Sequence, residues 1–363
     1  MTITDLEARL LHLPLKQPWT VGSAQVQGKD HVIVRITASG GEHGFGELSP
    51  LPSFSGETGA GAVEVLRLLR PALVGREVFD LEGAHRAMRE VVAHNTLARS
   101  AVDLALHDLA GRLLGVPVGV LLGGGAGSRE IPLCWAVAVS GIDKAVAEAV
   151  ARVQEGFRAV KLKVGVDAAE TEARVQAVRD AVGPAVRLRL DINGRYTGGE
   201  AVRLIRRLEP CELEYVEQPA RAGDTDGLAE VARRVGTPVM VDEGVWSPEE
   251  LIEVIRRRAA SEVNVKVGKL GGLVGARKTV AIAESAGMGC MVGCMLEGGV
   301  GMLAGAHLAA ALPGITHASE LVGSLLYRRD LLDISERYAH GTLRVPGEPG
   351  LGFRAEQVDW RDA

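Results

Sequence analysis

The sequence is poor in aromatic residues, and it has no excess of basic charge. Aromatic side chains make up 4% of the 363 residues, whereas glycine occurs 46 times. Small and branched aliphatic side chains must therefore fill the core, and many positions are turns or close backbone contacts. The 41 Lys and Arg residues are mixed along the chain with 46 Asp and Glu residues. This balance excludes the basic surface of a nucleic-acid-binding protein, and we expect a small-molecule partner.

Long apolar segments and paired cysteines are also missing. No apolar run reaches the roughly 18 residues that a membrane span needs, and the first residues resemble no leader sequence. The four cysteines stand in apolar stretches without the C-x-x-C spacing of a structural zinc site; they are Cys134, Cys211, Cys290 and Cys294. We therefore expect reduced core thiols in a cytoplasmic protein with no membrane partner.

Three zones of periodicity divide the chain. Residues 1–50 alternate as strands, and residues 56–122 carry apolar side chains at helical spacing. Short apolar strands then alternate with helical stretches. Analogous strand-end positions recur every 24–28 residues at Trp135, Lys163, Asp191, Glu217, Asp242 and Lys266, and then near Val292 and His317. Eight strands at this pitch predict a closed parallel barrel, with its active site at the C-terminal ends of the strands.

Charged residues gather at the predicted strand ends. Asp191, Glu217 and Asp242 end three consecutive strands, and three carboxylates that converge there would repel one another without a cation. A set of oxygen ligands without histidine or thiolate favours Mg²⁺, with Mn²⁺ as the alternative. The three residues are therefore predicted metal ligands.

Lysines flank this predicted metal site. Lys161 and Lys163 stand two apart on one strand and point to the same side, and Lys266 approaches from the opposite wall. In isolation, the lysine pair is better explained by one side chain that reaches solvent. Together with the carboxylates, the lysines predict a cationic base on each side of one metal-bound ligand.

These motifs together resemble the enolase superfamily, in its muconate lactonizing enzyme subgroup. The resemblance rests on Lys161-Leu-Lys163, Asp191-Ile-Asn193, Glu217-Gln-Pro219, Asp242-Glu243, Lys266-Val-Gly-Lys269, Gly44-Phe-Gly-Glu47 and Pro349-Gly-Leu-Gly. It implies an α/β fold with an N-terminal α+β capping domain (1–127), a (β/α)7β modified TIM barrel (128–325) and a C-terminal segment (326–363) that returns to the cap. It also implies a homo-oligomer, either a dimer or an octamer.

The shared chemistry of the superfamily is proton transfer next to a carboxylate, through an enediolate whose charge Mg²⁺ stabilises. Under this resemblance Lys163 and Lys266 are the predicted acid/bases. Lys161 is predicted to bind the substrate carboxylate and to lower the pKa of Lys163 by like-charge repulsion. Asn193 is a predicted substrate contact.

The lysines do not decide between cycloisomerisation, epimerisation and syn elimination. Specificity is expected from two cap loops and the last two strand ends, through Trp19, Phe54, Met295, Glu297, His317 and Glu320. Met295-Leu-Glu297 and Glu320 favour a muconate-type cycloisomerase, because the dipeptide epimerases usually carry two aspartates where Ala318 and Glu320 stand.

Three alternatives stay open. The loop that begins at Ser53 resembles the epimerases, which favours a racemase or epimerase of an amino-acid derivative or dipeptide. A syn-dehydratase such as o-succinylbenzoate synthase needs only one of the lysines. A non-catalytic carboxylate-binding protein is the alternative from another class, because a fold does not imply a function.

Overall fold

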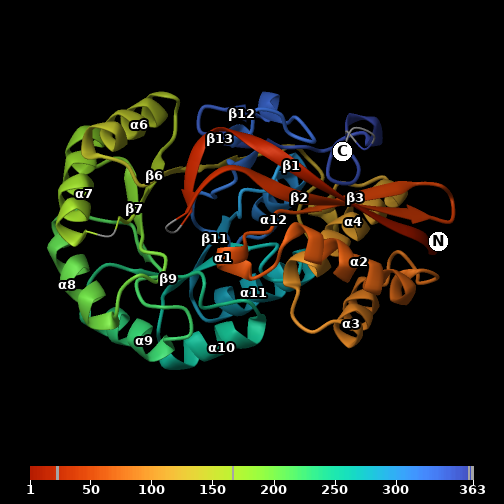
Figure 1. The fold of residues 1–363 in the computed structure, drawn as a ribbon, viewed down its shortest axis with the longest axis horizontal. Coiled ribbons are helices and arrows are strands. Elements are labelled where there is room, and N and C mark those ends of the chain that lie inside the picture. The colour runs from red at the N-terminus through yellow and green to blue at the C-terminus, as the bar shows by residue number, and fades with distance from the viewer. Residues whose placement is uncertain (22–23, 166, 359, 361–363) are drawn as a thin grey trace.

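The computed structural model describes residues 1–21, 24–165, 167–358 and 360, without the side chains of residues 19–25. Figure 1 shows an antiparallel sheet with helices beside it, next to a ring of helices that surrounds a curled parallel sheet. Within the described part of the chain, no helix is both long enough and apolar enough to cross a membrane.

The first sheet is antiparallel and packs on the helices of the first third of the chain. Its strands, in spatial order, are β1 (Ile3–Val21), β2 (Ala24–Ala38) and β3 (His43–Leu48). The helices that follow are α1 (Pro52–Ser55), α2 (Gly59–Leu73), α3 (Leu81–Val91), α4 (Thr96–Leu114) and α5 (Val118–Leu121). Together they form the cap.

Two glycines of the Gly44-Phe-Gly-Glu47 motif explain how closely the cap packs. A Cβ atom at Gly44 would lie 2.2 Å from the carbonyl oxygen of Ala105, and one at Gly46 would lie 1.9 Å from that of Ala101. Both contacts are with α4, so any larger residue would push this helix away from β3. The two glycines of the motif are therefore explained by packing within the cap.

The second sheet is parallel and forms the barrel. Its spatial order is β11 (Gly289–Gly293), β10 (Glu262–Lys266), β9 (Val239–Val241), β8 (Val216–Glu217), β7 (Arg187–Asp191), β6 (Ala159–Lys163) and β5 (Cys134–Val137). The surrounding helices are α6 (Ile142–Gln154), α7 (Ala168–Val182), α8 (Gly198–Leu208), α9 (Thr225–Arg234), α10 (Pro248–Arg257), α11 (Leu273–Ser285) and α12 (Gly299–Ala311).

Residues 315–319 close the barrel between its first and last strands. Ile315 forms a parallel bridge with Cys290 of β11, and Ser319 forms one with Leu133 next to β5. The Ser319 N–H donates to the carbonyl of Pro132 at 2.9 Å, and its carbonyl accepts from Cys134 at 2.8 Å. This segment takes the place of the eighth strand, and the predicted (β/α)7β barrel is confirmed.

Trp135 does not occupy the strand-end position that the spacing assigned to it. Its indole N–H donates to Glu148 on α6 at 2.8 Å, and its ring packs edge-on against Phe157 with the centroids 5.6 Å apart. Successive residues of a strand face opposite sides, so Trp135 points to the helical layer.

The C-terminal segment runs back along both parts of the protein. Its strand β13 (Thr342–Val345) pairs with β12 (Tyr338–Ala339) and with β4 (Arg129–Pro132), which precedes the barrel. Leu351 donates its N–H to Asp108 of α4 at 2.8 Å.

The described residues also form short 3₁₀ turns, which are Glu209–Cys211, Gly323–Leu326, Ser335–Arg337 and Ala355–Gln357. The boundaries at 127/128 and 325/326 stay a prediction.

Candidate active site

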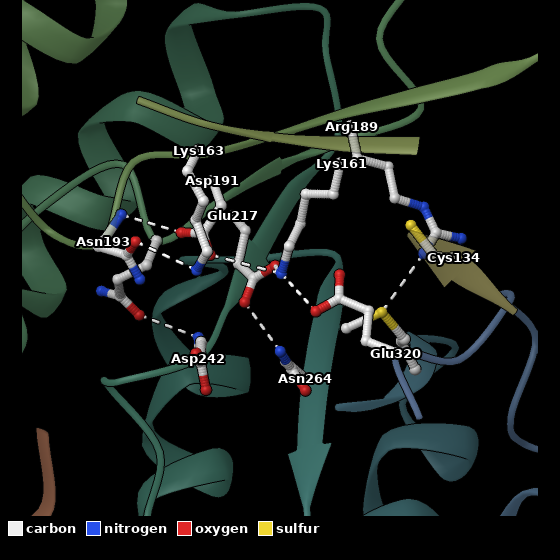
Figure 2. Close-up of polar contacts among 12 residues, drawn as sticks. Cys134, Lys161, Lys163, Arg189, Asp191, Asn193, Glu217, Asp242, Asn264 and Glu320 are labelled. Carbon is white, nitrogen blue, oxygen red and sulfur yellow. Dashed lines mark hydrogen bonds and ion pairs between the residues drawn. The ribbon is translucent and has the colours of Figure 1, made fainter. Parts of the chain in front are cut away.

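Three buried carboxylates lie side by side where neighbouring barrel strands end. Asp191 is the last residue of β7, Glu217 is the last residue of β8, and Asp242 follows β9 directly. Parallel pairing places Asp191 opposite Glu217, and all three side chains are buried. Figure 2 shows them together with Lys161 and Lys163 of β6.

The lysines of β6 contact the first two carboxylates. Lys161 Nζ lies 2.8 Å from Glu217 Oε2 and 3.4 Å from Asp191 Oδ2. Lys163 Nζ donates to Asp191, which is its register neighbour on β7. Both side chains therefore point to the carboxylates, as their spacing of two residues predicts.

Asp242 is held from the other side of the site. Lys266, the last residue of β10, places its Nζ 2.5 Å from Asp242 Oδ2. Lys269 Nζ lies 2.8 Å from Asp242 Oδ1 and also donates to the carbonyl of Asn264. Because β10 is four strands away from β6 in the sheet, Lys163 and Lys266 flank the row of carboxylates from opposite ends. Lys269 stood in the motif, but the sequence did not indicate its contact with Asp242.

The electrostatics of the carboxylates fit a divalent cation. Burial and the neighbouring charge of Asp191 raise the pKa of the Glu217 carboxyl to about 8. Within the described residues, no group of three or more His, Cys, Asp or Glu side chains is arranged so that it could hold a metal ion. Lysine ammonium groups instead contact each of the three carboxylates. A buried set of carboxylate oxygens is the donor chemistry that Mg²⁺ prefers.

Nearby carboxylates compensate the charge of the Lys161 ammonium. Burial alone would lower the pKa of Lys161, but the carboxylates of Glu217, Glu320 and Asp191 outweigh burial and hold that pKa well above its ordinary value. The effect of Lys161 on Lys163 stays a prediction.

Asn193 lies within the site and contacts a predicted base. Its Oδ1 accepts a hydrogen bond from Lys163 Nζ at 3.2 Å, and its Nδ2 donates to Glu243 Oε1 at 3.0 Å. The residue adopts a left-handed backbone conformation with φ of 48°. Glu243 was visible in the sequence as the neighbour of Asp242, but its contact with Asn193 depends on the fold.

Glu320 also reaches the site, from the segment that closes the barrel. Its Oε2 lies 2.6 Å from Lys161 Nζ, while its buried Oε1 accepts no hydrogen bond from the residues that the structure describes. Asn264 donates to Glu217 Oε1 at 2.8 Å and was not predicted as a site residue. Besides the three predicted metal ligands, the site therefore contains the carboxylate of Glu320, which contacts Lys161.

The cap contributes Phe54 to the same site. Lys266 Nζ lies 4.5 Å from the centroid of the Phe54 ring, which packs against Trp246 with the centroids 5.3 Å apart. Trp246 was not predicted, because its contact joins two segments that are distant in the sequence. The side chain of Trp19, the other predicted cap contact, lies outside the described residues.

Met295 and Glu297 lie where the cap meets the barrel. Met295 packs in the apolar core of the cap, and its carbonyl accepts a hydrogen bond from Lys29 of β2. Glu297 is buried, and its Oε2 accepts from the Met295 N–H at 2.6 Å. The contact with Lys29 gives Met295 a role in joining the two parts of the protein, and Glu297 holds the Met295 backbone.

The structure does not bring His317 to the site. Its Nε2 lies 2.7 Å from Glu262 Oε2, and its Nδ1 lies 3.4 Å from Glu214 Oε1. Glu262 is the first residue of β10, and Glu214 precedes β8. His317 therefore lies at the N-terminal ends of the strands, which we call the barrel floor, and the expectation that it lines the pocket is wrong.

Comparison with protein families agrees with this architecture. Residues 3–123 match the N-terminal domain of mandelate racemase and muconate lactonizing enzyme, and residues 144–358 match the family described as enolase C-terminal domain-like. The chain belongs to the enolase superfamily. Superfamily membership explains why an antiparallel cap and a parallel barrel occur in one chain with charged strand ends.

The relatives of this chain differ in the reaction that they are named for. The chain is 36% identical to L-Ala-D/L-Glu epimerase from Bacillus subtilis, covering 97% of both chains. It is also 36% identical to muconate cycloisomerase 1 from Rhodococcus opacus, covering 97% of this chain and 95% of that one. The structure of dipeptide epimerase from Enterococcus faecalis, complexed with Mg and the dipeptide L-Leu-L-Tyr, superposes with a TM-score of 0.92 at 32% identity, covering 97% and 99% of the two chains. The protein is thus an isomerase of this superfamily.

Proposed function

We propose that the protein is a Mg²⁺-dependent racemase or epimerase, acting on a small carboxylate such as a dipeptide. The proposal rests on the placement of Lys163 and Lys266 at opposite ends of one row of carboxylates. A carbon held between two lysines can lose a proton to one and receive a proton from the other, which inverts its configuration. The epimerases among the relatives support this reaction over the cycloisomerisation that the sequence motifs favoured.

The proposed metal ligands are Asp191, Glu217 and Asp242. Bound there, Mg²⁺ would supply positive charge that stabilises the negative charge developing on the substrate carboxylate. Lys161 adds a buried ammonium beside Glu217 and holds the substrate carboxylate in position. Asn193 orients Lys163 through its hydrogen bond with the lysine ammonium.

The proton transfers belong to the two outer lysines. In one direction, neutral Lys163 removes the proton next to the substrate carboxylate, and protonated Lys266 delivers a proton to the other face of the same carbon. In the reverse direction the two roles exchange. Lys266 is buried beside Asp242, whereas 22% of the Lys163 side chain is exposed beside Asp191, so bulk water is excluded more completely on the Lys266 face.

Stereospecific exchange in D₂O tests this proposal. The probes are L-Ala-L-Glu and L-Ala-D-Glu, each with Mg²⁺, and NMR follows deuterium incorporation next to the terminal α-carboxylate. Lys163→Ala and Lys266→Ala should each abolish epimerisation while retaining exchange of one stereoisomer, and the two variants should retain opposite stereoisomers. The exposed Lys278→Ala serves as a control. Exchange of the same stereoisomer by both variants would contradict the proposal.

A muconate-type cycloisomerase is the second candidate. Dipeptide epimerases usually carry two aspartates at the last strand end, where this chain has one buried carboxylate, that of Glu320. The muconate cycloisomerase from Rhodococcus is also as similar to this chain as the Bacillus epimerase is. Under this reaction the protein should consume cis,cis-muconate, and the decrease in the ultraviolet absorbance of muconate measures this consumption. Only one lysine would then be indispensable, and the other would act as a nearby charge.

A further inference from the structure

We infer that Phe54 of the cap is a positioning residue for Lys266, so that docking of the cap fixes one of the two bases and leaves the other largely unaffected. The inference rests on the proposed function, because it assigns a stereochemical consequence to a contact between two parts of the protein. Its basis is the geometry around the Lys266 ammonium.

Two supports hold the Lys266 ammonium from different directions. Asp242 Oδ2 accepts its hydrogen bond at 2.5 Å from the barrel side. The ring of Phe54 lies with its centroid 4.5 Å from Nζ and belongs to the cap. An ammonium at this distance from an aromatic ring is attracted to the ring face, and the attraction is strongest where water is excluded. Lys266 is buried, with 9% of its side chain exposed, so the contact is of the stronger kind.

The Phe54 ring is itself held in place. Phe54 lies in the short helix α1, where its N–H donates to the carbonyl of Leu51 at 2.8 Å. Its ring packs on Trp246 at an interplanar angle of 45°. The Trp246 indole donates to the carbonyl of Glu243 at 2.9 Å, which fixes this ring on the barrel loop beside Asp242. The aromatic pair therefore connects α1 of the cap to the wall that carries Lys266.

Lys163 is positioned by a different set of partners. Its ammonium donates to Asp191, the last residue of β7, and to Asn193, which follows this strand. These contacts belong to the barrel itself. Loss of the Phe54 ring should therefore impair proton transfer on the Lys266 face and leave the Lys163 face intact, whereas a general loss of structure would impair both faces.

The test measures exchange on each face separately. In D₂O with Mg²⁺, Lys163→Ala and Lys266→Ala first establish which stereoisomer of Ala-Glu each lysine serves. Phe54→Leu keeps an apolar side chain without the ring. It should slow exchange of the stereoisomer that Lys266 serves about tenfold. Exchange of the stereoisomer that Lys163 serves should change less than about threefold. Phe54→Tyr should retain the wild-type rates. Phe79→Leu, the same substitution at an exposed cap position, is the control.

A second readout does not need turnover. Reductive dimethylation, followed by peptide mass spectrometry, should label Lys266 faster in Phe54→Leu than in the wild type, while labelling of Lys163 stays the same. Equal losses on both faces, or unchanged exchange and labelling, would overturn the inference while the proposed function stands. A wild type that exchanges neither stereoisomer would instead refute the proposed function on these probes. In that case the labelling experiment alone tests the inference, and unchanged labelling of Lys266 in Phe54→Leu would overturn it.

Discussion

Replacement of His317 with Gln should remove a pH-dependent contribution to the stability of the barrel. Both ring nitrogens of His317 face carboxylates, with Nε2 at 2.7 Å from Glu262 and Nδ1 at 3.4 Å from Glu214. A neutral imidazole has one N–H, so it cannot donate to both carboxylates. The contacts therefore favour the imidazolium form, with its two donors.

The size of the effect follows from the pKa. Burial alone would lower the pKa of His317, but hydrogen bonds to Glu214 and Glu262 outweigh burial and raise it to about 9, from an ordinary value of 6.5. This difference corresponds to about 3 kcal/mol of unfolding free energy as an upper bound. Because the folded protein holds the proton more tightly, the contribution is complete below about pH 6.5 and is lost as the pH rises through about 9.

Urea unfolding followed by circular dichroism measures this contribution. At about pH 6 the wild type should unfold at a clearly higher urea concentration than His317→Gln, and the difference should shrink at about pH 9.5. His12→Gln is the matched control, since His12 pairs with Asp30 on the surface with 64% of its side chain exposed. A gap between wild type and His317→Gln that stays constant over this pH range would refute the reasoning.

Three further predictions concern the site and the cap. Glu217→Gln should weaken Mg²⁺ binding in calorimetry by at least about tenfold with little change in circular dichroism; unchanged affinity would remove Glu217 from the proposed ligands. Asp103→Asn should lower the unfolding free energy by about 3 kcal/mol, because buried Asp103 pairs with His85 at 2.6 Å and accepts from the Leu273 N–H of α11 at 2.5 Å. Urea denaturation measures this loss, and a variant as stable as the wild type would contradict the prediction. Binding of Mg²⁺ with a dipeptide should change the tryptophan emission through the Phe54–Trp246 pair, and an equal change in Trp246→Phe would exclude this pair as its source.

The repeat of strands and helices could be predicted from the sequence, because each βα unit has a similar length. The repeat gives the spacing of the strands but not the side to which each residue points. Trp135 and Lys163 stand at equivalent spacing, yet Trp135 contacts α6 while Lys163 contacts Asp191 in the site. The eighth position shows the same limit, since His317 lies at the barrel floor and Glu320 contacts Lys161.

The cluster of charged strand ends could also be predicted, because parallel strands bring their C-terminal ends to one edge. The contacts made across the barrel or with the cap could not. Trp246 meets Phe54, and Asn264 meets Glu217, only after the chain has folded. The compensation of Lys161 by Glu320 is of the same kind.

The pairing of β13 with β4 has a consequence for biosynthesis. Thr342–Val345 hydrogen-bond with Arg129–Pro132, so a strand made late in translation completes a sheet begun before the barrel. Until Thr342 has emerged from the ribosome, β4 lacks this partner and exposes an unpaired strand edge. The nascent protein is therefore expected to stay vulnerable to aggregation and proteolysis at this edge until its synthesis is almost complete.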